Sequence, residues 1–206
     1  MNDMDKLIIC IGRRVGAGGK RVASLLGQRL SLPVYDNELI AEAARKSGFS
    51  ASLFKESDEK RHFSLIGSLF GSNRYGSFTG NAINEGELFR LQGEAIRGLA
   101  EKGSCIFVGR ASDYILREMS GVVSVFLTAP ASVRAEELAR RENIDRQQAE
   151  GQIRKRDKAR ENWYNLYTFG TWGDSSQYDL CIDTSKTGID GAAELICRFA
   201  ALRGLL

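Results

Sequence analysis

The sequence predicts an α/β fold in which a parallel sheet carries helices on both faces. Five short apolar runs alternate with longer amphipathic segments, and the runs span residues 7–11, 33–35, 105–108, 122–127 and 178–182. Parallel neighbouring strands need a crossover connection, usually a helix, so this alternation favours a parallel sheet. Such sheets bind their ligands beyond the carboxyl ends of the strands, and functional residues are expected there.

Length and composition are those of a globular protein, and a single domain over residues 1–206 is expected. The chain is 43% apolar and 27% charged, which is enough for one hydrophobic core. A net charge of +3 is mild, so no nucleic-acid partner is expected. The four cysteines form no C-x-x-C pair, and no apolar run approaches the length of a membrane span. We therefore expect a cytoplasmic protein without a membrane partner.

Two segments interrupt the alternation of strands and helices. Residues 50–86 begin as a predicted helix and continue into the Gly, Ser and Asn-rich stretch "GSNRYGSFTGNAINEG", which is too long for an ordinary connection. Residues 143–177 hold a charged helix, capped at Asn143 or Asp145, and then "LYTFGTWGDSSQ". Both segments are predicted to be insertions over the ligand-binding edge of the sheet.

The first strand leads into a glycine-rich turn in "KLIICIGRRVGAGGKRVASLLGQRL", which predicts a phosphate-binding site. A strand that ends near Gly12 and a helix that begins near Gly18 place free backbone amides at a helix N-terminus. Those amides and the helix dipole favour an anion. The glycines let the backbone approach phosphate oxygens, and Lys20 or Arg21 can add a full positive charge.

The turn matches two nucleotide-binding templates incompletely. The pattern G-x-x-x-x-G-K-[ST] requires a glycine where Arg14 stands and a hydroxyl where Arg21 stands. The pattern G-x-G-x-x-G would use Gly16 and Gly18 but meets Arg21 at its third glycine, where a large side chain opposes close helix packing. A phosphate ligand is common to both interpretations.

Polar residues also follow two later strands. Asp36, in "PVYDNELI", can either cap a helix over residues 37–46 or bind ligand. Arg110, in "IFVGRASDY", ends a buried strand, where an arginine is expected to meet an anion or an acid. Asp113 can likewise act as a cap or bind substrate.

The segment "IRKRDKAR" is compatible with a helix and concentrates arginines. Arg156 and Arg160 are four residues apart and share one helix face, whereas Arg154 projects elsewhere. Arginine neutralises charge that develops on a transferred phosphoryl group, so this helix could form a lid over bound phosphates. A solvated charged face is the alternative. Aromatic residues that follow could stack on a base or pack the helix onto the body: Trp163, Tyr164, Tyr167 and Trp172.

Taken together, these segments resemble the cytidylate kinase-like family, a branch of the P-loop nucleoside monophosphate kinases with a modified glycine loop. The resemblance rests, in family order, on "GRRVGAGGKRVASLLGQRL", "PVYDNELI", "LFRLQGEAIRGLAEKGSCIFVGRASDYIL", "VFLTAP" before an arginine-rich helix, and "YTFGTWGDSSQYDLCIDTSKTGID". It spans nearly the whole chain. It implies a P-loop NTPase-type, adenylate-kinase-like fold with a five-stranded parallel sheet, an acceptor-binding insertion at about 50–86 and a lid at about 143–177.

The resemblance also implies an activity, in which Mg-ATP donates its γ-phosphoryl group to CMP or a related small acceptor. The residues implied to bind the phosphates of ATP are Arg13 at the rim of the loop, Gly16, Ala17, Gly18, Gly19, Lys20, Arg21 and Arg154. The residues implied to bind the acceptor are Asp36, Arg110 and Asp113, and the implied catalytic residues are Lys20, Arg156 and Arg160. Asp157 would position one of the lid cations, and no metal ligand is identified.

Two departures from the family pattern bear on activity. Cytidylate kinases resemble G-x-x-G-x-G-K-G-T, so the lysine of this chain is moved by one position and Arg21 stands in place of the magnesium-binding threonine. Ala111 stands where those enzymes have an acid after Gly-Arg. Two alternatives therefore stay open: a catalytically weak or inactive nucleotide-binding regulatory protein, and a kinase for a non-nucleotide small acceptor.

Overall fold

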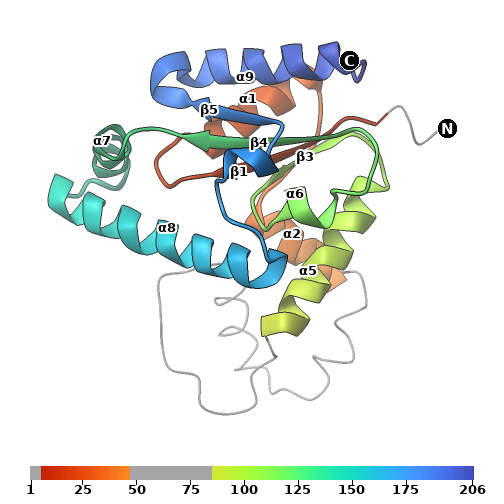
Figure 1. Ribbon diagram of the computed structural model, residues 1–206, viewed down its shortest axis with the longest axis horizontal. Coiled ribbons are helices and arrows are strands. Elements are labelled where there is room, and N and C mark those ends of the chain that lie inside the picture. The colour runs from red at the N-terminus through yellow and green to blue at the C-terminus, as the bar shows by residue number, and fades with distance from the viewer. Residues whose placement is uncertain (1–5, 47–84) are drawn as a thin grey trace.

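The computed structural model describes residues 6–46 and 85–206. These residues form a parallel five-stranded sheet in the order β2-β3-β1-β4-β5, with helices on both faces (Figure 1). The strands are β1 (Ile8–Arg13), β2 (Val34–Tyr35), β3 (Cys105–Val108), β4 (Val122–Thr128) and β5 (Leu180–Asp183). All five predicted strands are confirmed. The expected acceptor-binding insertion at 50–86 lies outside the described residues, apart from its last two.

The helices follow the crossover pattern that parallel strands require. They are α1 (Gly19–Leu30), α2 (Asn37–Lys46), α5 (Glu85–Ala100), α6 (Ser112–Ile115), α7 (Ala131–Glu142), α8 (Arg146–Thr168) and α9 (Thr184–Leu202). The predicted helix over residues 37–46 is confirmed. Asp145 caps α8 by accepting a hydrogen bond from the Gln148 amide at 2.7 Å, whereas Asn143 ends α7 in the left-handed conformation.

The central strand β1 shows why both faces of the sheet are covered. It pairs with β3 on one side and with β4 on the other, and its side chains alternate between the two faces. Ile9 and Ile11 are fully buried against α1 and α9, and Ile8 and Cys10 are fully buried in the cluster formed with α2, α5 and α6. Each such aliphatic side chain contributes about 1.5–3 kcal/mol by leaving water. The run of apolar residues without alternation is therefore explained by burial on two sides.

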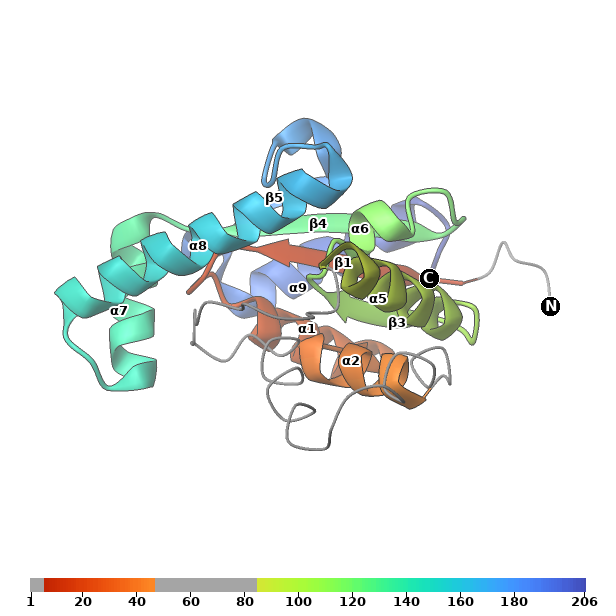
Figure 2. The ribbon, with the colours of Figure 1, turned by 90° about the horizontal axis from the view of Figure 1, so that it is seen from below.

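Helices α7 and α8 form a hairpin beside the carboxyl ends of the strands (Figure 2). Their contact includes an apolar cluster, to which Val15 from the turn after β1 also belongs. The glycine-rich turn is thereby packed against the hairpin. Of the helices in the described part of the chain, none combines the length and apolarity needed to cross a bilayer.

Candidate functional site

The glycine-rich turn joins β1 to α1 and has the backbone of an anion-binding loop. Gly16 and Gly18 adopt left-handed conformations, with φ of 83° and 77°. A Cβ on Gly16 would lie 2.6 Å from the carbonyl oxygen of Arg134, so only glycine fits this position. Gly18 is the N-cap of α1 without a side-chain cap, and the first turn carries no acid. The amides at the start of α1 are therefore left for an anionic ligand.

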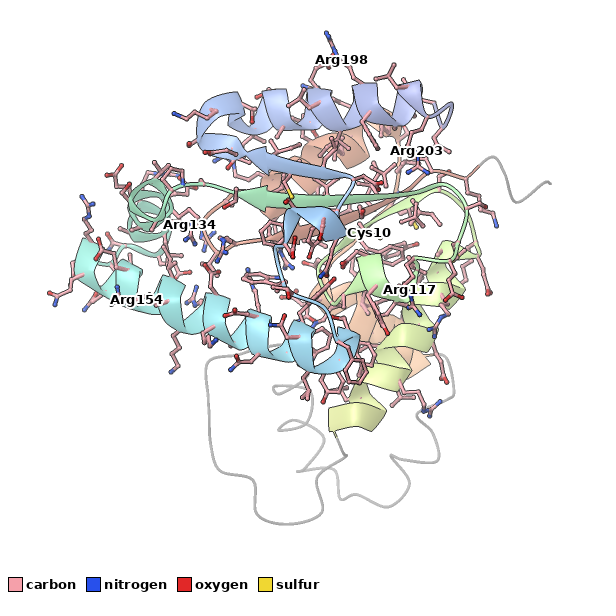
Figure 3. All side chains as sticks on the ribbon, viewed as in Figure 1. Cys10, Arg117, Arg134, Arg154, Arg198 and Arg203 are labelled. Carbon is pink, nitrogen blue, oxygen red and sulfur yellow. The ribbon has the colours of Figure 1, made fainter. Side chains whose placement is uncertain are left out.

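A buried ion pair holds this loop from behind. One carboxylate oxygen of Asp157 accepts from the Val15 amide at 2.8 Å, and the other accepts from the Arg134 guanidinium at 2.7 Å. The same guanidinium donates to the Val15 carbonyl at 3.0 Å and to the Ala129 carbonyl at 2.8 Å. Arg134 lies on α7, toward α8, which carries Asp157 (Figure 3). We call Arg134 and Asp157 the loop clamp, because together they bind both polar groups of one loop residue.

Three guanidinium groups gather in front of the loop, from Arg13 at the end of β1, Arg110 after β3, and Arg160 on α8. Arg160 donates to the Arg13 carbonyl at 3.2 Å. Burial, followed by the charges of Arg160 and Arg110, lowers the pKa of Arg13 to about 9. Burial and the charge of Arg160 lower the pKa of Arg110 to about 10. We call these three residues the arginine cluster.

The arginine cluster is built for an anion. Burial, ahead of any neighbouring charge, also lowers the pKa of Arg160, although Asp157 opposes the shift. The values for the other two members lie well above 7, so those groups stay cationic at neutral pH. Within the described ranges, neither Arg13 nor Arg160 forms a salt bridge with a carboxylate. A multivalent anion would stabilise these neighbouring positive charges, and each arginine offers it a planar pair of N–H donors.

Asp36 caps α2, which is one of the two roles considered for it, and its role toward a ligand stays a prediction. One carboxylate oxygen accepts from the amides of Glu38 and Leu39 and caps α2, and the other accepts from the Lys20 ammonium at 2.9 Å. Partial burial by itself would raise the pKa of Asp36, but these hydrogen bonds hold it below its usual value. Lys20 is therefore directed to Asp36, and its side chain is 68% exposed.

Asp113 lies on α6 but does not cap it. Its carboxylate is buried and accepts a hydrogen bond from the Tyr164 hydroxyl at 2.7 Å. Burial raises the pKa of Asp113, although the bond from Tyr164 opposes the shift. This contact joins α6 to α8.

The two remaining lid arginines of the sequence prediction, Arg154 and Arg156, do not belong to the arginine cluster. Arg156 binds Glu142 on α7 through two hydrogen bonds, of 2.8 and 3.1 Å. Arg154 is on the exposed face of α8 (Figure 3). Of the three predicted lid arginines, the structure thus brings Arg160 to the loop. Asp157 contacts Arg134, from the other helix of the hairpin, in the loop clamp.

The loop does not offer a magnesium site of the usual kind. Arg21, where a hydroxyl ligand would stand, directs its guanidinium toward Glu137 at 3.6 Å. The Asp36 carboxylate is occupied by Lys20 and two amides. The part of the chain that the structure describes has no group of three or more His, Cys, Asp or Glu residues arranged for a metal ion. The residues at the loop therefore do not fit a protein-ligated magnesium ion.

The aromatic residues of α8 and the following turn pack the hairpin onto the body. Tyr167 stacks on Phe89 with ring centroids 4.8 Å apart, and Trp163 meets Phe89 edge-on at 5.5 Å. Trp172 packs on Phe126 at 5.3 Å. The Trp163 ring also lies 5.7 Å from the guanidinium carbon of Arg110, which helps to orient that member of the arginine cluster.

Comparison with known proteins agrees with this geometry. A family model described as "Cytidylate kinase-like family" matches residues 8–186, which cover the loop, the arginine cluster and the α7–α8 hairpin. The chain belongs to the cytidylate kinase-like family. It is 26% identical over 194 residues to the cytidylate kinase of Methanocaldococcus jannaschii, in a match that covers 92% of this chain and 95% of the relative.

Solved structures share the fold of this chain. An uncharacterized protein from Eubacterium ventriosum is 27% identical, with a TM-score of 0.73, and the match covers 95% of this chain and 99% of that chain. Shikimate kinase from Acinetobacter baumannii, at 15% identity and a TM-score of 0.51, covers 99% of this chain and 97% of its own. This second likeness concerns the fold alone, a parallel sheet with flanking helices.

Some residues of this cytidylate kinase-like site were missed from the sequence. Arg134 was not singled out, although it stands four residues before Leu138 on the buried face of α7. An arginine on the otherwise apolar face of a helix indicates a buried partner for its charge, and this was the signal in the sequence. Thr184 was also missed, and its hydroxyl lies 3.1 Å from the carbonyl oxygens of both Ala17 and Thr128. It ties the loop to β4, and nothing in its local sequence indicates that role.

Proposed function

We propose that this protein transfers the γ-phosphoryl group of ATP to CMP or a related small acceptor. The observation that carries the proposal is the arginine cluster in front of a glycine loop, at the carboxyl ends of β1 and β3. Phosphoryl transfer needs positioning and charge neutralisation more than covalent chemistry from the protein. The loop supplies the positioning and the cluster supplies positive charge, since in the described part of the chain neither Arg13 nor Arg160 has a carboxylate at salt-bridge distance. Family membership and the cytidylate kinase relatives support the same reaction class.

In this proposal the loop amides and the N-terminus of α1 bind the donor phosphates, and Lys20 lies at the edge of the loop near Asp36. Arg160 stabilises the negative charge that develops on the phosphoryl group during transfer, because its guanidinium reaches the Arg13 carbonyl at the loop entrance. Arg110 extends from β3 on the acceptor side and binds the phosphate of the acceptor. No general base is assigned, since an acceptor phosphate oxygen is already a nucleophile.

The hairpin of α7 and α8 acts as the lid in this proposal, within one domain over residues 1–206. Asp157 fastens α8 to the loop through the loop clamp, so the lid and the phosphate site change shape together. Arg156 stiffens the hairpin through Glu142 rather than facing the loop. A lid of this kind excludes water from the reacting phosphates.

ATP is the donor implied by the family. It usually binds to kinases as a complex with Mg²⁺, whose charge helps to neutralise the phosphates. The residues at the loop do not fit a protein-ligated ion, so the proposed steps depend on the loop amides and the arginines of this chain. The same feature favours one alternative function. The Arg21–Glu137 contact at the magnesium-ligand position is compatible with a nucleotide-binding regulatory protein of weak or absent turnover.

An assay of ADP release tests the proposal across nucleoside monophosphates and small non-nucleotide alcohols, with ATP binding measured in parallel. CMP or a related monophosphate is expected to stimulate ADP release. Binding of ATP without stimulation by any acceptor would contradict kinase activity and favour the regulatory alternative. Stimulation by a non-nucleotide alcohol alone would assign the second alternative.

A pair of variants connects this activity to the arginine cluster. Arg160→Met is expected to lower kcat roughly 100-fold or more, because it removes one charged donor from the transition state. Arg198→Ala is the matched control, since Arg198 is exposed on α9 and directed away from the sheet (Figure 3). An equal kcat in the two variants would contradict the role given to Arg160.

A further inference from the structure

The position of the phosphate-loop lysine is physically occupied in this chain. In the pattern G-x-x-x-x-G-K-[ST], the lysine directly follows the second glycine and reaches the terminal phosphates. When Gly16 and Gly18 are aligned with the second and third glycines of the family pattern G-x-x-G-x-G-K-G-T, Gly19 stands at the lysine position and Arg21 at the hydroxyl position. A Cβ added to Gly19 would lie 2.7 Å from Cγ of Arg13, 3.1 Å from its Cβ and 3.3 Å from its Cδ. The aliphatic stem of Arg13 therefore fills the volume in which a side chain at position 19 would begin.

The other end of Arg13 reaches the next strand of the sheet. Its guanidinium lies against the α-carbon of Gly109, which directly follows β3 and has a φ of 79°, and a Cβ on Gly109 would collide with the guanidinium nitrogen Nη1. Gly109 directly precedes Arg110, and Arg160 donates to the Arg13 carbonyl. Two glycines, one at each end, thus leave the path along which Arg13 runs from the loop into the arginine cluster.

Lys20, the lysine that the sequence does contain, takes another direction. Its ammonium lies 2.9 Å from a carboxylate oxygen of Asp36, and its side chain is 68% exposed. A lysine neutralised by an acid has less charge to offer a phosphate. Arg13 has no carboxylate at salt-bridge distance within the described ranges.

We propose that Arg13 replaces the phosphate-loop lysine: its guanidinium, rather than the Lys20 ammonium, is the loop cation that binds the terminal phosphates of a nucleoside triphosphate. This inference rests on the proposed function and identifies the donor-binding cation of the same site. A guanidinium presents two parallel N–H donors to a phosphate, which an ammonium does not. The glycines at positions 19 and 109 are explained at the same time, because both are needed for the path of one arginine.

Isothermal titration of ATP and of inorganic pyrophosphate into the full chain tests the assignment. Arg13→Met keeps the aliphatic stem against Gly19 and removes the charge, so it is expected to fold and to weaken both ligands on the order of 10- to 100-fold. Lys20→Met is expected to weaken them by a smaller factor, and Arg198→Ala on α9 is the control for loss of a remote charge. Thermal unfolding of each variant reports whether it is folded.

An exchange of positions gives a sharper test. Gly19→Lys alone is expected to bind poorly, because its new Cβ meets the Arg13 stem. The double variant Arg13→Ala with Gly19→Lys opens that space, supplies a cation from position 19, and is expected to bind pyrophosphate more tightly than either Arg13→Ala or Gly19→Lys alone.

The outcomes separate this inference from the function on which it rests. A wild-type chain that binds neither ATP nor pyrophosphate would contradict the proposed function. A wild-type chain that binds both, with a folded Arg13→Met variant of equal affinity, would overturn the Arg13 assignment and leave the function standing. A larger loss in Lys20→Met than in Arg13→Met, or a folded double variant without recovery, would also overturn it.

Discussion

Replacing Asp157 by Asn is expected to lower the free energy of unfolding by about 3–5 kcal/mol, the usual effect of removing one member of a buried ion pair. The side chains of Arg134 and Asp157 are 8% and 10% exposed, so water has little access to solvate the Arg134 guanidinium once its partner charge is removed. Asparagine keeps the shape and an acceptor for the Val15 amide at 2.8 Å, so the change removes the negative charge that faces Arg134 at 2.7 Å and Arg14 at 3.8 Å. For a chain of this size the expected fall in Tm is about 6–20 °C.

Urea and thermal unfolding measure this effect, and ATP titration shows whether the loop depends on the loop clamp. Arg146→Ala is the matched control on α8, because Arg146 forms an exposed pair with Glu150 that is worth at most about 1 kcal/mol. The binding affinity of the Asp157 variant is expected to fall as well, since Arg134, which binds the Val15 carbonyl, loses its counter-charge. An unfolding free energy for Asp157→Asn within about 1 kcal/mol of the Arg146→Ala value would refute the loop clamp.

Two further substitutions test the loop and the contact between α6 and α8. Gly16→Ala is expected to cost about 1–3 kcal/mol in unfolding free energy and to weaken ATP binding, because φ is 83° and the new Cβ would meet the Arg134 carbonyl; Gly151→Ala, with open space around it on α8, is the control and should be neutral or stabilising. Tyr164→Phe is expected to cost about 1–3 kcal/mol near pH 7, because it removes the side-chain hydrogen bond that the buried Asp113 carboxylate accepts from Tyr164. Burial raises the pKa of Asp113, so the stability linked to its proton is present at low pH and lost as pH rises through that raised pKa. Since the Tyr164 bond opposes this rise, the deficit of the variant should shrink as the pH of urea unfolding is lowered from about 7 to 4, and a deficit independent of pH would contradict the assignment.

The sheet could be predicted from the sequence because its strands are buried on both faces. The run from Leu7 to Ile11 is continuously apolar and reads as a strand without knowledge of its partners. The edge at which Asp36 and Arg110 lie follows from parallel strand order, since carboxyl ends of parallel strands meet at one edge. The cap of α8 at Asp145 follows from local hydrogen bonding three residues along the chain.

The loop clamp and the path of Arg13 could not be predicted, because they depend on distant side chains. Arg134 and Asp157 lie on different helices, and their pairing requires the crossing of α7 and α8 to be known. Arg13 was expected at the rim of the loop, but its side chain runs past Gly19 toward Gly109. Neither glycine indicates that path by itself, because a glycine in a turn has several possible causes.

The partners of each arginine separate support of the loop from binding of ligand. Arg134 is neutralised by a carboxylate and donates to two carbonyl oxygens, so it has little left to offer a phosphate. Arg13 and Arg160 lie close together and, within the described ranges, have no carboxylate at salt-bridge distance. Burial is the main cause of the lowered pKa of Arg13, and the nearby charges of Arg160 and Arg110 lower it further, so an anion at this place would stabilise the cluster. A fold that neutralises one buried arginine behind its glycine loop and leaves others cationic in front of it is organised to bind phosphate at that front.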